Sequence, residues 1–317
     1  MIHDVAVLGP GRIGRQIALA FAVGGCRVRL VDLKTRTAAE TRAVFDDARR
    51  EIARDLTLMA EEAVIARAEV DATLARISDH AGLDGLRGVG FVQEALPELI
   101  DLKRETFGRL GAAIDDDAII ACGSSTISPQ HLVASVKGRE RFVGTHWLNP
   151  AHIIPLVEVV AGPGTSERTV ERTLTLLEGL GKTPVRCGDS PGFIGPRLQV
   201  LLMNEAVRLV EEGVATPEDV DKAFKAGMGF RYGTIGIFEF IDWGGVDILH
   251  RASGFLTKAL NDDRFRAARL VDEKIAKNEL GPKTGRGFFD YSGDKRDTFE
   301  TAKVRALLRQ MKRTSTP

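Results

Sequence analysis

Two side chains twelve positions apart, His146 and Glu158, are of the types that a proton-transfer pair needs. Both lie in THWLNPAHIIPLVEVV, residues 145–160, which is otherwise mostly apolar. We expect a chain reversal after Asn149-Pro150 to bring the carboxylate back beside the imidazole. A glutamate bonded to one ring nitrogen fixes the tautomer, so that the other nitrogen can accept a hydroxyl proton. The pattern therefore predicts a general base, against the alternative of a satisfied core histidine.

A second group of residues, GPGRIG at 9–14, fits the pattern GxGxxG and stands between an apolar run and an amphipathic helical pattern. In that context the glycines allow a tight turn, close approach of a pyrophosphate and packing of helix against strand. The start of the helix adds free N–H groups for the phosphates. We therefore predict dinucleotide contacts from Gly9, Gly11, Arg12, Ile13 and Gly14.

A carboxylate follows at the end of the next apolar run, where Asp32 stands 18 residues after Gly14. At this place a carboxylate accepts hydrogen bonds from the adenine ribose and repels a 2′-phosphate. The nearby Lys34 and Arg36 weaken that repulsion. The predicted cofactor is NAD in preference to NADP.

The elements that must position these residues alternate between apolar runs and helical patterns up to residue 188. Expected strands cover 2–9, 26–32, 88–95, 117–124, 142–146, 156–160 and 183–189, and expected helices cover 12–24, 98–111 and 167–180. This alternation predicts a doubly wound α/β sheet of the Rossmann type. Residues 35–75 are charged and almost free of glycine and proline, so we expect a long helix or helical hairpin that departs from the sheet.

The pattern changes near residue 189, after which only helices are predicted. They cover 193–212, 217–227, 237–243, 246–260, 266–277 and a basic tail from 301. A chain of 317 residues is long enough for two cores. We therefore predict an NAD-binding domain over 1–188 and an all-α C-terminal domain over 189–317.

The overall charge excludes some classes of partner. Basic and acidic residues balance at 44 each, so neither nucleic acid nor an anionic membrane is an expected partner. Three widely spaced cysteines (Cys26, Cys122 and Cys187) predict buried free thiols in a reducing compartment, and no Cys/His cluster indicates a metal. The start of the chain lacks signal-peptide character, and no run reaches about 18 apolar residues, so we expect a cytoplasmic protein.

In their order along the chain, these motifs resemble the 3-hydroxyacyl-CoA dehydrogenase family, including its lambda-crystallin/gulonate dehydrogenase branch and a branch that acts on small carboxylated alcohols such as a pyridine carboxylate. The matching segments are GPGRIG (9–14), QEALPELIDLK (93–103), GSSTIS (123–128), HWLNP to LVEVV (146–160), SPGFI (190–194) and GPKTGRGFFDY (281–291). The resemblance covers nearly the whole chain. It implies a Rossmann domain followed by a helical domain that forms a homodimer, in enzymes of fatty acid metabolism.

The resemblance also implies roles for single residues. His146 and Glu158 match the catalytic histidine and its partner, and Ser125 matches the serine that bonds the substrate oxygen. Ser124 and Thr126, in the same loop, are alternatives to Ser125.

Three further residues match cofactor contacts of the family, namely Glu98, Lys103 and Lys283. Helix capping for Glu98, solvation for Lys103 and a turn position for Lys283 are the structural alternatives.

Two departures from the family pattern bear on the substrate. Pro196 stands where the family carries an asparagine, and it can donate no hydrogen bond. Another residue must then hold the substrate carbonyl or carboxylate, and Ser125, Ser124 and Asn149 are the candidates. Residues 45–75 contain no lysine, although lysines of this segment help to hold CoA in the family; the arginines at 49, 50, 54 and 67 substitute only in part.

We therefore predict an NAD-dependent dehydrogenase that oxidises the hydroxyl of a 3-hydroxyacyl-CoA-type or related 3-hydroxy acid. One alternative is a dehydrogenase of a small hydroxy-carboxylate or heterocyclic alcohol without CoA. The other is a crystallin-like protein that binds NAD without turnover. His152 is either structural or a substrate contact, and Trp147 is either a core residue or a stacking platform.

Overall fold

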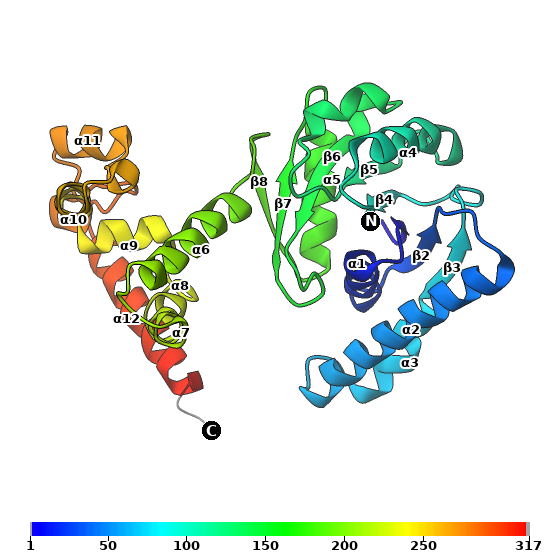
Figure 1. The fold of residues 1–317 in the computed structure, drawn as a ribbon, viewed down its shortest axis with the longest axis horizontal. Coiled ribbons are helices and arrows are strands. Elements are labelled where there is room, and N and C mark those ends of the chain that lie inside the picture. The colour runs from blue at the N-terminus through cyan, green and yellow to red at the C-terminus, as the bar shows by residue number, and fades with distance from the viewer. Residues whose placement is uncertain (1, 315–317) are drawn as a thin grey trace. The chain divides into compact units, whose positions relative to one another are not determined.

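The computed structural model describes residues 2–314 and divides the chain into two compact units, which meet in sequence between Leu202 and Met203 (Figure 1). This division lies inside helix α6 (Gly195–Glu211). The boundary predicted between residues 188 and 189 precedes that helix, so the two placements differ by the segment 189–202.

The first unit is built on one sheet of eight strands. They are β1 (Asp4–Leu8), β2 (Arg27–Asp32), β3 (Ile77–Ala81), β4 (Phe91–Glu94), β5 (Ile119–Cys122), β6 (Phe142–Trp147), β7 (Leu156–Val160) and β8 (Thr183–Cys187). Their order is β3-β2-β1-β4-β5-β6-β7-β8, and all neighbours are parallel except β6 and β7. This confirms the predicted Rossmann-type sheet. The carboxyl ends of β1 to β6 meet at one edge, where ligands of such sheets bind.

Both faces of the sheet are covered. Helices α1 (Arg12–Val23), α2 (Ala38–Glu61) and α5 (Glu167–Gly179) contribute to one core, and α4 (Ile100–Ala113) contributes to the other. Strand β1 sends Val5 and Val7 into the first core and Ala6 and Leu8 into the second. Burial on both faces explains why the parallel strands are continuous apolar runs in the sequence.

The helical excursion is a hairpin. Helix α2 begins after Thr37, which forms a capping box with Glu40, and a turn of 3₁₀ helix, η1 (Arg67–Glu69), leads into α3 (Val70–Ala75). Strand β3 follows directly and pairs with β2, although the sequence does not predict it. Only Ile77 among its five residues is buried, so an edge strand of this kind leaves little apolar pattern to detect.

Beyond Met203 the described residues form helices, turns and two isolated bridges around Arg286, but no strand. The helices are α7 (Pro217–Ala223), the π-helix η5 (Phe224–Gly229), α8 (Phe230–Tyr232), α9 (Ile237–Gly244), α10 (Val246–Leu260), α11 (Arg269–Ala276) and α12 (Lys295–Thr314). This confirms the predicted all-α character. No helix within residues 2–314 has the length and apolar character needed to cross a membrane.

The cysteines are free thiols, as expected. Cys26 and Cys122 are buried, but Cys187 is partly exposed. It ends β8, which is the edge strand opposite β3 and pairs on one side only. The prediction of burial is therefore wrong for this residue.

Candidate active site

The glycine loop between β1 and α1 forms a cradle for an anionic ligand. Gly9 has a φ of +106°, and a Cβ there would lie 2.7 Å from the carbonyl oxygen of Ala95. A Cβ on Gly14 would meet the carbonyl oxygen of Gly9 at 1.8 Å, so both positions require glycine. Gly11 faces open space and, as the N-cap, gives α1 no side-chain hydrogen bond. The first N–H groups of α1 are thus left for a ligand, and this arrangement fits the pyrophosphate of NAD.

Asp32 ends β2 at the same edge of the sheet and is buried. Its carboxylate accepts a hydrogen bond from the Lys34 N–H at 3.2 Å and another from the Arg36 Nε at 2.6 Å. The guanidinium of Arg36 offsets part of the charge with which Asp32 would repel a 2′-phosphate. The carboxylate still stands where a ribose acceptor is expected.

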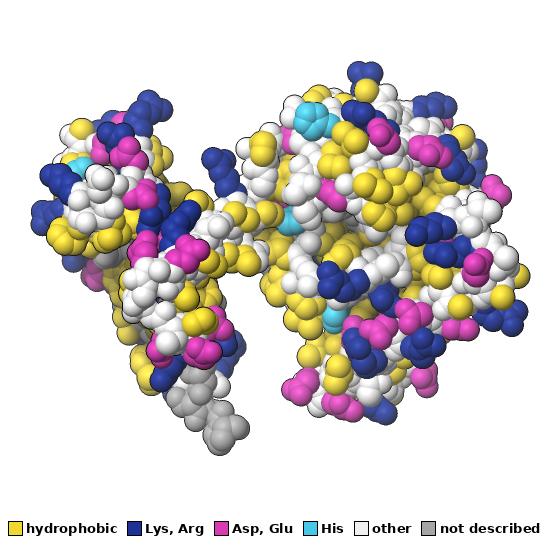
Figure 2. Space-filling view, viewed as in Figure 1, with side chains coloured by type: hydrophobic (Ala, Val, Ile, Leu, Met, Phe, Trp, Pro, Cys, Tyr) yellow, Lys and Arg dark blue, Asp and Glu magenta, His cyan; other side chains and the backbone are white. Residues whose placement is uncertain are grey.

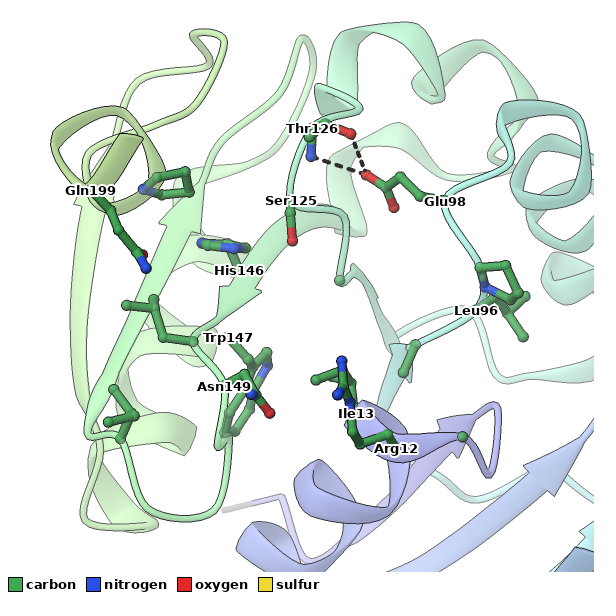
Figure 3. Close-up of a pocket in the computed structure, with 17 residues that line it drawn as sticks. Arg12, Ile13, Leu96, Glu98, Ser125, Thr126, His146, Trp147, Asn149 and Gln199 are labelled. Atoms are coloured by element: carbon green, nitrogen blue, oxygen red, sulfur yellow. Dashed lines mark hydrogen bonds between the residues drawn. The ribbon is translucent and has the colours of Figure 1, made fainter. Parts of the chain in front are cut away.

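A cavity of about 910 Å³ lies beside the glycine loop (Figure 3). It is bordered by the start of α1, the loops after β4 and β5, the end of β6 and the first turns of α6. The sequence-predicted residues in its lining are Gly11, Arg12, Ile13, Glu98, Ser125, His146 and Asn149. The predicted base and the predicted cofactor loop therefore border the same space.

His146 and Glu158 are directly opposite each other in the antiparallel pair β6 and β7. Nδ1 of His146 lies 2.7 Å from Oε2 of Glu158, and both side chains are buried. The other oxygen, Oε1, accepts hydrogen bonds from the N–H groups of Ile194 at 2.7 Å and Gly195 at 2.8 Å. The ring of Phe193 packs on the imidazole at 5.7 Å. The carboxylate is thus fixed on both sides, because the start of α6 holds one oxygen and the imidazole the other.

The loop after β5 separates the candidate serines. The Ser124 hydroxyl is buried and donates to Glu98, whose Oε1 also accepts the Thr126 N–H at 3.0 Å and the Thr126 hydroxyl at 2.9 Å. Ser125 is exposed and lines the cavity, and its hydroxyl points into it in Figure 3. Of the three hydroxyls, Ser125 is therefore the one not committed to Glu98.

The same contacts determine the charge of Glu98. Burial alone would raise the pKa of this carboxyl, but the hydrogen bonds from Ser124 and Thr126 and the charge of Lys103 lower the pKa to about 2. Glu98 is therefore ionised at neutral pH and anchors the loop that carries Ser125. A role in loop structure is thus shown by its contacts, while its contact with NAD stays a prediction.

Lys103 lies beneath this loop and is not solvated. Its side chain is 1% exposed, and Nζ lies 2.6 Å from Glu94 and 3.4 Å from Glu98. Glu94 also accepts the N–H groups of Leu96 at 2.7 Å and Gly123 at 3.2 Å. Sequence reasoning missed Glu94, because a carboxylate at the end of a buried strand gives no hint of its partner. Lys103 is outside the cavity lining, and its contact with NAD stays a prediction.

The turn between β6 and β7 is braced by a buried lysine. Lys182 is buried, and its Nζ donates to the carbonyl oxygens of Ala151 at 2.7 Å, His152 at 3.2 Å and Ile154 at 2.9 Å. The His152 ring lies toward α2, with Nε2 3.7 Å from the Asp55 carboxylate. Burial lowers the pKa of His152. Since His152 is not part of the cavity lining, this placement favours its structural alternative.

Trp147 belongs to the core, although its edge also borders the cavity. Its Nε1 donates to Oε1 of the buried Gln93 at 3.1 Å, and its ring packs on Phe21 at 5.7 Å. Asn149 follows on the cavity side of the turn. The core interpretation of Trp147 is therefore the one that its contacts support.

Lys283 lies in the second unit, where its ammonium pairs with Asp247, and its predicted contact with NAD is untested by this placement.

Pro196 lines the cavity, and so does Gln199, three residues further along α6. Sequence reasoning missed Gln199, although residues three apart on a helix share a face.

Known families cover nearly the whole chain. The family model described as the 3-hydroxyacyl-CoA dehydrogenase NAD binding domain matches residues 4–190, and the model of the C-terminal domain of the same family matches residues 192–291.

Individual proteins show the same likeness. The chain is 34% identical to 5-formyl-3-hydroxy-2-methylpyridine 4-carboxylate 5-dehydrogenase of Mesorhizobium japonicum, over 97% of each chain. It is 33% identical to a probable 3-hydroxybutyryl-CoA dehydrogenase of Bacillus subtilis, over 92% of this chain and 98% of that protein. Among solved structures, a 3-hydroxyacyl-CoA dehydrogenase of Archaeoglobus fulgidus superposes with a TM-score of 0.76 at 28% identity, covering 98% of this chain and 99% of the other.

Proposed function

The chain belongs to the 3-hydroxyacyl-CoA dehydrogenase family and is an NAD-dependent oxidoreductase, and on that premise we propose that it oxidises the hydroxyl of a 3-hydroxy acid or its thioester with His146 as the general base. The observation that carries this proposal is the 2.7 Å contact between His146 and Glu158 at the border of the cavity. The NAD cradle at Gly11 borders the same cavity.

The proton transfer follows from the hydrogen bonds of the imidazole. Glu158 occupies Nδ1 as an acceptor, so Nδ1 carries the hydrogen and Nε2 is free to take the hydroxyl proton. The glycine loop and Asp32 would hold NAD, which would supply an acceptor for the hydride of the carbinol carbon. The alcohol thus loses one hydride and one proton and becomes a carbonyl compound. Glu158 stabilises the imidazolium that remains, and Ser125 is placed to bond the reacting oxygen.

A second candidate substrate is a small hydroxy-carboxylate or heterocyclic alcohol without CoA. The arginines of the α2 hairpin favour it, because three of them already pair with carboxylates. Arg49 pairs with Asp79, Arg50 with Asp47, and Arg54 with Asp55, each at 2.9 Å. These guanidinium groups are partly neutralised, so they offer CoA phosphates less charge than free side chains would. The named activity of the Mesorhizobium relative, on a pyridine carboxylate, is consistent with such a substrate.

The test is NADH production at 340 nm with three compounds in parallel: 3-hydroxybutyryl-CoA, free 3-hydroxybutyrate and a pyridine carboxylate that bears a hydroxymethyl group. Preference for the thioester would support the first substrate class and a place in fatty acid metabolism. Preference for free 3-hydroxybutyrate would support the first class in its form without CoA, and preference for the pyridine carboxylate would support the second class. No NADH with any of them, together with retained NAD binding, would instead support the crystallin-like alternative.

We also propose that the second unit forms a homodimer. Large apolar side chains are exposed on it, as Figure 2 shows for the visible face, and they include Val207, Val214, Phe238, Ile248, Phe255, Leu270 and Phe289. An apolar surface of this extent is typical of an interface. Light scattering after gel filtration should give twice the mass of one chain; the mass of a single chain would refute the dimer.

A cytoplasmic location is likewise proposed. Its support is the presence of three free cysteines, since thiols persist in reducing compartments. Cell fractionation with a soluble reductase as marker would test it.

A further inference from the structure

Gln199 presents an uncommitted amide to the cavity. Its side chain lines the cavity, and within residues 2–314 the amide has no hydrogen-bond partner. In Figure 3 the side chain extends from α6 toward the side of the cavity where His146 lies. An exposed glutamine without a hydrogen-bond partner contributes little to stability. The Gln199 amide is therefore free to bind a ligand in the cavity.

The start of α6 fixes where that amide can reach. The N–H of Gly195 is bonded to Glu158, which holds His146, so the first turn of the helix is tied to the base. Pro196 suits this first turn, where its missing N–H costs nothing and its fixed φ is already helical. Gln199 lies one turn further on the same face, about 4.5 Å along the axis.

The cofactor is expected on the other side of the base. In the view of Figure 3, Arg12 and Ile13 of the glycine loop and Gln199 lie on opposite sides of His146. The other uncharged polar groups of the lining include Ser125 and Asn149, and Ser125 already has the reacting oxygen as its expected partner. The Gln199 amide is therefore available to a second polar group of the substrate.

We propose that Gln199 binds the carbonyl or carboxylate oxygen of the hydroxy substrate and so orients the carbinol carbon relative to His146. This inference rests on the proposed function. It assigns to Gln199 the substrate contact that Pro196, at the asparagine position of the family, cannot make. An amide suits the task because its NH₂ donates to a carbonyl or carboxylate oxygen without adding a charge. The sequence-predicted candidates for this contact were Ser125, Ser124 and Asn149; Ser124 is excluded by its bond to Glu98.

The experiment compares wild type with Gln199→Leu, which removes the amide at similar volume, and with Gln199→Glu, which keeps the length and adds a charge. The control is Arg197→Leu, an exposed change on the same helix outside the cavity lining. Steady-state rates are measured with the best substrate of the wild type, and the KM for NAD and the pH profile are recorded for each variant.

We expect kcat/KM for the hydroxy substrate to fall at least about tenfold in Gln199→Leu, the effect of one lost hydrogen bond that leaves a polar group unpaired. A free carboxylate substrate should lose more in Gln199→Glu, because the like charge repels it. The KM for NAD and the pKa of the pH profile should not change, which separates this role from a disturbance of His146.

Three outcomes would refute the inference. Kinetics of Gln199→Leu within twofold of wild type would overturn it and leave the proposed function intact. An equal loss in Arg197→Leu would show that any change to the helix has this effect. A wild type that makes no NADH with any compound would overturn the proposed function itself, and this inference with it.

Discussion

Two buried carboxylates of the first unit have similar surroundings and different uses. Glu158 and Glu94 are each fully buried, and each accepts hydrogen bonds from backbone N–H groups and meets one basic side chain. The partner of Glu158 is His146, an imidazole on the cavity border, whereas the partner of Glu94 is Lys103, which is buried with it. Only the first partner borders the cavity and has a second nitrogen that can take a proton.

The charge of Lys103 shows why its pair is structural. Burial would lower the pKa of Lys103, but the charge and the hydrogen bond of Glu94, together with the weaker effects of Cys122 and Glu98, outweigh burial, and the pKa is raised. The lysine therefore keeps its proton under the conditions in which a histidine exchanges one. A buried glutamate can thus support a base where its partner is an imidazole at the cavity border, as at His146, and cannot do so where its partner is a lysine buried with it. Glu94 and Lys103 instead brace the loops after β4 and β5.

We expect the largest effect from a substitution that breaks the buried pair of Lys103 and Glu94. Lys103→Met removes the only charged partner within 3 Å of Glu94 among the described residues, and leaves that carboxylate buried without compensation. We expect the free energy of unfolding to fall by about 3 kcal/mol or more. Urea unfolding followed by circular dichroism measures it. The exposed Lys137→Met serves as the control, and an equally small change in both variants would refute the role of the pair.

The catalytic pair should respond in rate instead. His146→Gln removes the base, and we expect kcat to fall by at least about 10²-fold, the range of general-base catalysis, while NAD affinity stays near that of wild type. Stopped-assay kinetics and fluorescence titration with NADH measure the two quantities. Unchanged turnover in this variant would exclude His146 as the base.

Glu158→Gln tests the role of the carboxylate in the same pair. It keeps the shape of the side chain at position 158 but changes the tautomer of His146. The amide oxygen can accept the N–H groups of Ile194 and Gly195, so its NH₂ then faces Nδ1. That arrangement places the ring hydrogen on Nε2, where it blocks proton uptake. We expect a loss of about tenfold to 10²-fold in kcat, and Glu167→Gln, which changes an exposed glutamate at the start of α5 that pairs with Arg186, should have no effect.

A smaller effect separates the two serines. Ser125→Ala should lower kcat/KM about tenfold, the contribution of one hydrogen bond to the reacting oxygen, with little change in stability. Ser124→Ala should mainly raise the pKa of Glu98, because it removes a donor to that carboxylate. Kinetics and thermal unfolding of both variants check the assignment; a larger kinetic loss in Ser124→Ala would reverse it.

The smallest effect concerns acid stability. The pKa of Glu98 is about 2 in the folded chain against an ordinary 4.5, so the folded state favours the ionised form. The resulting stabilisation is complete above pH 4.5 and is lost as the pH falls toward 2. Glu98→Gln should therefore lose less stability than wild type over this window, as urea unfolding at several pH values would show. Parallel curves would contradict the assignment.

The sequence predicts the features whose pattern repeats along the chain or whose chemistry is local. The glycine loop, the sheet and the partnership of His146 with Glu158 belong to these, since strand pairing with a short connection can return a residue to its neighbour. It does not predict β3, whose edge position demands little apolar sequence, or the burial of Lys103, which depends on Glu94 nine positions earlier. His152 shows the same limit, because its direction is set by Lys182 and by α2.

Glu158 links the catalytic base to helix α6, because its two carboxylate oxygens bond to different parts of the chain. One oxygen of Glu158 bonds to the imidazole and the other to the N–H groups at the start of α6. The orientation of the imidazole therefore depends on an intact first turn of this helix. A substitution that frays the turn would look like a chemical defect in turnover with ordinary cofactor affinity, though it touches no reacting group. Pro196 strengthens this turn, because its ring fixes a helical φ at the start of the helix. The residue that replaces the asparagine amide of the family therefore also stabilises the turn that holds the base.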